Sequence, residues 1–346
     1  MKRFFCLLCA LLLTAACAFA EPVIIMPEME KLPVYTAIPR DFTRTVTPEM
    51  FNASGIAKTV KGRHNTYSVT FADEARLDCH REALYYNEYS GEVEQTYETE
   101  TGEKVTETLP KPTAASAASS LAGWMTFGWP ETGEIYPLEN ESLTHITLDE
   151  AKKHAEALLA ALGMEGYVCE TALDMTLERI LTMSEKWGEL LDSGKLVSSY
   201  RYDCSGATTE DEGYLLRYRR FGTESDLSGQ FYADFYVTAK GFATISITDQ
   251  YAMGEVISIP ETLVSWQEAA KSLIKELADS RMQPEFQEVL SARLAWCPVR
   301  DKQSETGMAF TPAWVLLFSA EHDGRIDEMH GIFNAVNGKF ITGVWY

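Results

Sequence analysis

The sequence predicts an α+β protein, in which an N-terminal antiparallel β-rich part is followed by two tandem α-β-β-β modules. Short alternating apolar and polar runs between residues 66 and 107 are typical of half-buried strands. Two amphipathic segments in the second half begin with the same helix-capping pattern, and strand-like runs follow each of them. We therefore expect a leader and three folded parts, with the bounds 1–20, 21–123, 124–260 and 261–346.

Residues 1–20 have the pattern of a secretory signal peptide. Lys2 and Arg3 precede an apolar stretch, and Ala18-Phe19-Ala20 matches a cleavage site of the A-x-A type. The alternative is a lipoprotein signal, in which Cys17 is lipidated and becomes the first residue of the mature chain. Both alternatives predict an extracytoplasmic protein, either secreted or associated with the cell envelope.

The chain is strongly acidic, with 30 Lys and Arg residues against 51 Asp and Glu residues and a net charge of −21. Phosphate backbones repel such a chain, so we expect no nucleic-acid partner. A peptide, a protein or an envelope component is the expected partner. Contact with a membrane is expected only through a lipid anchor on Cys17.

The cysteines and histidines show no metal-ligand spacing. Four cysteines lie beyond the leader, without any C-x-x-C pair, and their three disulfide pairings stay open: Cys79, Cys169, Cys204 and Cys297. The six histidines are equally scattered. We therefore predict no metal and no cofactor.

The first part of the mature chain is expected to be extended. Prolines at 22, 27, 33 and 39 block a regular helix, which predicts a strap over residues 21–45 that contributes an edge strand. An antiparallel meander is expected over 66–107, with hairpin corners at Ser90-Gly91 and Thr101-Gly102. Residues 109–123 are rich in Pro, Ala and Ser, and we expect a linker or a loose helix there.

Aromatic residues suggest a binding surface after this linker. Trp124, Phe127 and Trp129 lie in the Gly- and Pro-broken run GWMTFGWPETG. Such a loop could hold a sugar or a peptide, or it could anchor its rings in a domain seam. Together with Trp187, these three residues form the candidate binding surface.

The two modules begin alike. Thr147 with Glu150, and Ser265 with Glu268, each form the S/T-x-x-E pattern of a capping box at the start of a helix. Glycine-bearing turns follow in both modules, at Lys240-Gly241 and at Asn337-Gly338, and the second is predicted to be a type I′ turn.

Residues 177–211 are an insertion that belongs to the first module alone. A helix is expected over 177–192, with its apolar side formed by Ile180, Met183, Trp187, Leu190 and Leu191. This helix could be a lid or a partner surface, or it could close an exposed sheet face. It is the most module-specific element of the sequence.

The chain carries no recognised catalytic motif. G-x-S-x-G, H-E-x-x-H, Walker A and G-x-G-x-x-G patterns are all absent from the sequence. We therefore expect a non-enzymatic binding or regulatory protein and predict no catalytic residues.

Several segments resemble a family of exported proteins of uncharacterised function, often lipoproteins, from Gram-positive gut anaerobes. They are LPVYTAIPRDFT, LTHITLDEAKKHAEALLAALG and FTPAWVLLF. The C-terminal modules also resemble PepSY-type, two-component-regulator-associated domains, through Asn334, Ala335, Gly338 and Ile341. The resemblance implies an envelope location and a binding, inhibitory or regulatory role. A secreted hydrolase with a site of dispersed residues and a PepSY-like protease inhibitor remain alternatives.

Overall fold

The structure is a computed structural model of the chain. It describes residues 22–25, 32–63, 66–98, 104–127, 143–164, 166–195, 201–220, 231–249, 251–280, 284–322 and 324–344. Cys17, Trp129 and the expected corner at Thr101-Gly102 lie outside these ranges.

The described residues divide into two compact units. The eight-stranded unit lies within Pro39–Phe221 and Ser228–Ala252, and the seven-stranded unit lies within Met1–Ile38 and Met253–Tyr346. The expected boundary between residues 123 and 124 falls inside helix α3 (Ala114–Phe127) of the eight-stranded unit. The structure is thus α+β, as expected from the sequence.

The sheet of the eight-stranded unit is antiparallel and has the order β3-β4-β5-β6-β12-β11-β10-β9. Its strands are β3 (Ile56–Lys61), β4 (Tyr67–Phe71), β5 (Arg76–Cys79), β6 (Ala83–Asn87), β9 (Tyr167–Met175), β10 (Gly213–Arg220), β11 (Phe231–Thr238) and β12 (Gly241–Asp249). Strand β6 pairs directly with β12. The β-rich N-terminal strands therefore continue the sheet of the first module and do not form a separate part.

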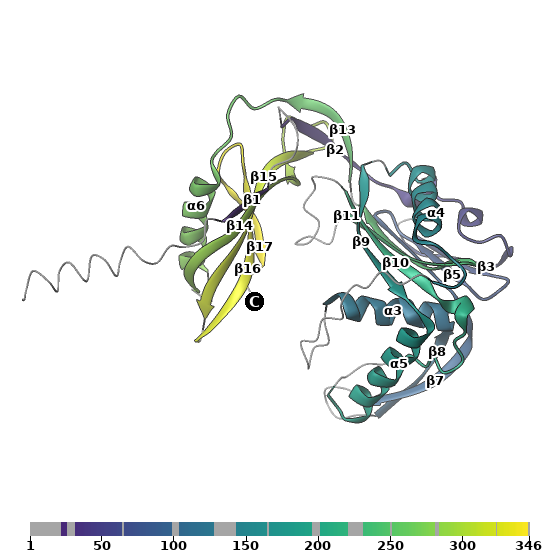
Figure 1. Ribbon diagram of the computed structural model, residues 1–346. Coiled ribbons are helices and arrows are strands. Elements are labelled where there is room, and N and C mark those ends of the chain that lie inside the picture. The colour runs from purple at the N-terminus through teal and green to yellow at the C-terminus, as the bar shows by residue number, and fades with distance from the viewer. Residues whose placement is uncertain are drawn as a thin grey trace, which may run out of the picture. The chain divides into compact units, whose positions relative to one another are not determined.

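Helices cover both faces of this sheet (Figure 1). Helix α4 (Leu148–Ala161) packs on one face, and α3 and α5 (Leu177–Asp192) pack on the other. Adjacent residues of β10 separate the two cores, because Leu216 faces α4 and Leu215 faces α3 and α5. Helix α5 occupies the range expected for the inserted helix, and it covers a sheet face.

Residues 89–127 differ from the expectation. Ser90-Gly91 is not a hairpin corner: Gly91 lies inside β7 (Tyr89–Glu98), where the register with β8 (Lys104–Pro112) shifts. Its φ of 92° suits glycine at such a bulge. Residues 109–123, expected to be a linker or a loose helix, form the end of β8 and most of the buried helix α3. The small side chains of α3 allow close packing on the sheet: Ala115, Ala117, Ala118 and Ala122.

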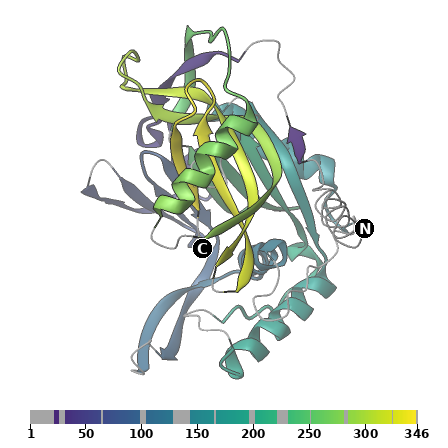
Figure 2. The ribbon, with the colours of Figure 1, turned by 90° about the vertical axis from the view of Figure 1, so that its left-hand side faces the viewer.

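The sheet of the seven-stranded unit is mixed and curled. Its strands are β1 (Val23–Ile25), β2 (Val34–Pro39), β13 (Tyr251–Ser258), β14 (Glu285–Arg300), β15 (Met308–His322), β16 (Arg325–Asn334) and β17 (Phe340–Val344). Helix α6 (Trp266–Asp279) lies across β14 to β17 (Figure 2).

The expected extended strap is confirmed at β1 and β2, whereas its last described residues, Phe42–Thr45, form a short helix. Strand β1 pairs in parallel with β14, and β2 pairs with β13 and β15. Two side chains fasten the strap: Trp296 Nε1 donates to the Pro33 carbonyl at 2.8 Å, and Thr306 Oγ1 donates to the Ala37 carbonyl at 2.7 Å. These bonds satisfy carbonyls that a proline-broken segment leaves outside regular pairing.

Each module contains a helix and four antiparallel strands, where three strands were expected. The strand orders β12-β11-β10-β9 and β14-β15-β16-β17 are both meanders. Both predicted capping boxes are confirmed, at Thr147 with Glu150 and at Ser265 with Glu268.

The predicted type I′ turn is wrong. Gly338 has a φ of 72°, whereas Asn337 is not among the described residues with positive φ. The turn closes instead through Gly338 N–H, which donates to the Asn334 carbonyl at 2.8 Å. The Asn334 side chain also accepts from Val336 N–H, so an asparagine before the turn organises it.

The described residues also include the short helix α2 (Phe42–Thr45) and 3₁₀ turns at Pro48–Met50 and Thr209–Asp211. No helix in the described ranges is both long and apolar enough to span a membrane.

Candidate functional site

Of the four aromatic residues expected to form a binding surface, Trp187 is the one whose side chain the structure describes. Trp124 and Phe127 lie in the last turns of α3, where the structure describes the backbone alone. Trp187 lies on α5 and is 1% exposed, so its ring belongs to the core between the helices and the sheet. Its ring centroid lies 5.1 Å from that of Tyr202.

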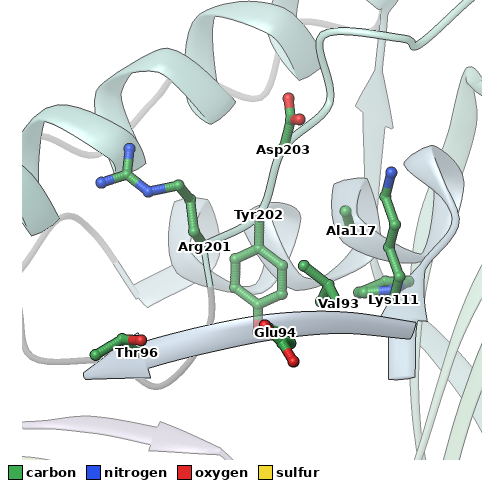
Figure 3. Close-up of a pocket in the computed structure, with 9 residues that line it drawn as sticks. Val93, Glu94, Thr96, Lys111, Ala117, Arg201, Tyr202 and Asp203 are labelled. Carbon is green, nitrogen blue, oxygen red and sulfur yellow. The ribbon is translucent and has the colours of Figure 1, made fainter. Parts of the chain in front are cut away.

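Tyr202, which contacts this core, also lines a cavity of about 340 Å³, here called the ribbon pocket (Figure 3). The pocket lies between the β7–β8 ribbon, helix α3 and the segment 201–203. Its lining consists of Val93, Glu94, Thr96, Lys111, Pro112, Ala117, Arg201, Tyr202 and Asp203. A volume of this size is at the lower end of the ~300–1,000 Å³ typical of small-molecule sites.

The segment 201–203 has no regular secondary structure, yet α5 holds it in place. Ser184 Oγ donates to the Tyr202 carbonyl at 2.7 Å and accepts from Cys204 N–H at 3.0 Å. One hydroxyl on a helix thus satisfies two backbone groups of the segment. With Trp187 behind Tyr202, these contacts fix one wall of the pocket.

The opposite wall is the β7–β8 ribbon, which pairs with no other described strand. A two-stranded ribbon is marginally stable by itself, and here α3 packs against β8. Thr96 and Thr106 face each other across the ribbon, with their hydroxyls 2.7 Å apart. The stability of the ribbon therefore depends on its contact with the rest of the eight-stranded unit.

Charges of both signs line the pocket. Lys111 and Glu94 are exposed, and neither makes a hydrogen bond or an ion pair within the described part of the chain. Arg201 pairs with Asp192 of α5. Hydrogen bonds from Ser205 hold the pKa of the Asp203 carboxyl below its ordinary value, and Lys111 and Arg201 lower it further. Asp203 is therefore ionised at neutral pH.

A second depression of about 530 Å³ adjoins the ribbon pocket along α5. It shares Arg201, Tyr202 and Asp203 with the pocket, and Leu181, Gly188 and Asp192 are among its other lining residues. The segment 201–203 therefore borders both depressions.

The nine lining residues of the ribbon pocket include two carboxylates, Glu94 and Asp203, two cations, Lys111 and Arg201, and the phenol of Tyr202. The nearby Cys204 is buried, and burial raises the pKa of its thiol to about 12, so the thiol is protonated at neutral pH. The pocket thus offers charge, hydrogen-bonding groups and an aromatic ring to a ligand.

Other predicted features are also placed. The four described cysteines are free thiols, with Cys79, Cys204 and Cys297 buried and Cys169 partly buried. In the ranges that the structure describes, no three His, Cys, Asp or Glu side chains gather where they could hold a metal ion.

Sequence reasoning missed Lys111 and Glu94 because they lie in segments assigned to a linker and to an acidic strand face. Arg201, Tyr202 and Asp203 lie within the predicted insertion 177–211, but the sequence analysis singled out none of them. The sequence signal that could have indicated the pocket was the insertion itself, because it contributes one wall of the pocket and has no counterpart in the second module.

Comparison with known proteins gives little on function. No family model matches the chain, and no curated protein matches it. One similar solved structure is an uncharacterised protein from Eubacterium rectale, with 11% sequence identity over 90% of this chain and 86% of that one and a TM-score of 0.47. At this level of similarity the match carries no functional argument, and the resemblance to PepSY-type modules stays a prediction.

Proposed function

We propose that the protein is an exported binding protein that holds a peptide in the ribbon pocket without acting on it chemically. The observation that carries the proposal is the pocket wall at 201–203, which Ser184 and Trp187 hold in place. Preorganised walls reduce the entropy lost on binding, so a site made this way favours a ligand.

The lining supports a peptide over other ligand classes. Val93, Pro112 and Tyr202 offer apolar contact, while Lys111 and Glu94 add a donor and an acceptor. A peptide has apolar side chains, amide groups and charged ends, and it matches this mixture. Nucleic acid and anionic lipid do not, because the chain carries a net charge of −21.

Export is part of the proposal and depends on the N-terminal sequence. Lys2, Arg3 and the A-x-A site at 18–20 support it. The intact mass of the native protein distinguishes cleavage before Glu21 from lipidation at Cys17. A mass that still includes residues 1–20 would contradict export.

Calorimetric titration with pools of short peptides tests the binding function. We expect binding to the wild-type protein and a loss of at least about tenfold in affinity for Thr96→Tyr, which places a ring in the pocket. Thr59→Tyr is the matched control, because Thr59 is an exposed strand threonine of the same unit that lines neither depression. Its affinity should equal that of the wild type.

Two results would contradict the proposal. Equal affinities of Thr96→Tyr and Thr59→Tyr would place the peptide elsewhere. Cleavage of the peptides during incubation, followed by mass spectrometry, would favour the hydrolase alternative instead.

A further inference from the structure

We infer that an extended peptide segment pairs as a third strand with the edge of β7 that no described strand occupies, and that its residues follow a basic-apolar-basic order. The inference rests on the proposed peptide-binding function and makes it narrower. It specifies an internal pattern of the Lys-Val-Lys type, and the ends of the peptide take no part in recognition.

The first argument is the open edge of the β7–β8 ribbon. Strand β7 pairs with β8 and with no other described strand, so a row of its backbone N–H and C=O groups has no strand partner in the described ranges. Strand β8 contains Pro110 and Pro112, which have no N–H, and α3 packs against it. Strand β7 contains no proline, so its edge is the one that suits the addition of a strand.

The second argument is the charge on one face of the ribbon. Glu92 and Glu94 are exposed and lie two residues apart on β7, so they point to the same face. Their partners on β8 are Pro110 and Thr108, and neither carboxylate therefore faces a cation across the ribbon. Two basic side chains at alternate positions of an added strand lie beside these carboxylates. A second copy of the chain, with its net charge of −21, is repelled at such a face.

The third argument is the residue between the two glutamates. Val93 points to the other face of the ribbon, where it lines the ribbon pocket together with Ala117 and Tyr202 (Figure 3). The central residue of an added strand lies beside Val93, so an apolar side chain there adds contact at the pocket. The period of two along a strand thus relates Glu92-Val93-Glu94 to a basic-apolar-basic ligand.

The test is calorimetric titration with end-blocked pentapeptides, at low ionic strength because the two glutamates are exposed. We expect acetyl-Thr-Lys-Val-Lys-Thr-amide to bind about fivefold more tightly than its isomer with the order Thr-Val-Lys-Lys-Thr, the effect of one exposed charge pair. Adjacent lysines point to opposite faces of a strand, so only one lysine of the isomer meets a glutamate. The acidic analogue Thr-Glu-Val-Glu-Thr should bind more weakly than either.

N-methylated peptides test the strand pairing itself. The N–H groups of neighbouring residues point to opposite sides of an extended peptide, so the first lysine and the valine direct theirs to different edges. We expect methylation of one of these two nitrogens to weaken binding at least about tenfold, and methylation of the other to have little effect. Equal losses from both changes would overturn the inference.

Two variants assign the basic positions to their glutamates. With Glu92→Gln or with Glu94→Gln, the two isomers should bind equally, because one glutamate remains for either peptide. Glu107→Gln is the matched control, because Glu107 is an exposed residue of β8 that lies on the face opposite to Glu94 and does not line the pocket. The preference between the isomers should stay as in the wild type.

The outcomes separate this inference from the function on which it rests. If both isomers bind the wild type equally and Thr96→Tyr weakens both, the pocket binds peptides and the inference about an added strand is wrong. If Glu107→Gln removes the preference as Glu94→Gln does, the effect is one of net charge, and the inference is also wrong. If neither isomer nor any pooled peptide binds, the proposed function fails with it.

Discussion

The two modules share a scaffold and differ in what is added to it. In both, a helix with a capping box packs on a four-stranded antiparallel meander, α4 on β9 to β12 and α6 on β14 to β17. The first sheet continues into β3 to β6 and carries α3 and α5 on its second face. The second sheet continues into β1, β2 and β13.

This difference shows where to look for function. Every residue that lines the ribbon pocket lies on an element added to the first module: the β7–β8 ribbon, α3 or the segment 201–203. None lies on the shared helix and meander. The lining of the candidate site thus comes from the additions and not from the repeated scaffold.

The largest expected effect tests whether the two scaffolds are equivalent. Leu159 on α4 and Leu277 on α6 occupy the same position relative to their caps and are 3% and 1% exposed. Each Leu→Ala change should lower the stability of its own sheet by about 3 kcal/mol, through lost burial and a cavity. Hydrogen exchange measures this loss of stability, in β10 and β11 for Leu159→Ala and in β14 and β15 for Leu277→Ala.

Lys153→Ala and Lys271→Ala, at matched exposed positions of the same helices, serve as controls and should change stability by less than about 0.5 kcal/mol. A loss at Leu159 without a loss at Leu277 would show that the modules are not equivalent.

The next effect concerns the attachment of the insertion. Glu212 is 7% exposed and accepts hydrogen bonds from Thr144 N–H at 2.9 Å and from Leu177 N–H, the first residue of α5, at 3.0 Å. Glu212→Ala leaves both amides without this acceptor and should cost about 2–3 kcal/mol of unfolding free energy. Denaturant unfolding measures the loss, and the exposed Glu210→Ala should show no comparable change.

Glu212 also predicts a pH dependence. Burial opposes its charge, but hydrogen bonds from Thr144 and Leu177 hold the pKa of the carboxyl below its ordinary value of 4.5. The stabilisation is therefore complete above that pH and is lost as the pH falls through the folded-state pKa. The advantage of the wild type over Glu212→Gln should shrink below about pH 4.5. A difference that does not change with pH would contradict this role.

The smallest effect compares the two caps. Thr147→Ala and Ser265→Ala should each cost about 1 kcal/mol, because each removes the acceptor for a first-turn amide. Faster hydrogen exchange at the backbone amides of Glu150 and Glu268 measures the loss of each cap directly. Ser272→Ala, inside α6, should instead be neutral or slightly stabilising, because alanine has the higher helix propensity. A loss as large as that of Ser265→Ala would mean that capping is not the cause.

Local signals explain which parts of the fold could be predicted. Both capping boxes and the helix at 177–192 follow from residues within one or two helical turns. Helix α3 could not be distinguished from a linker because its buried face is built largely from alanines, which give little amphipathic contrast. The pairing of β6 with β12 joins residues far apart in the sequence, such as Tyr85 with Ser246, and no local pattern specifies it.

The candidate site was harder to predict for the same reason. Lys111, Glu94 and Tyr202 come from three segments that meet only after α3 and α5 have packed on the sheet. Each residue by itself is unremarkable in the sequence. Trp187 stood out as an aromatic residue, but its ring is buried, and it acts through its contact with Tyr202.

Hydrogen exchange with and without a saturating Lys-Val-Lys pentapeptide tests the central claim that ligand binding belongs to the added elements. The account predicts slower exchange in residues 89–98, 104–112 and 201–205, and unchanged exchange in α6 and in β14 to β17. Protection confined to the seven-stranded unit, or spread equally over both modules, would contradict it.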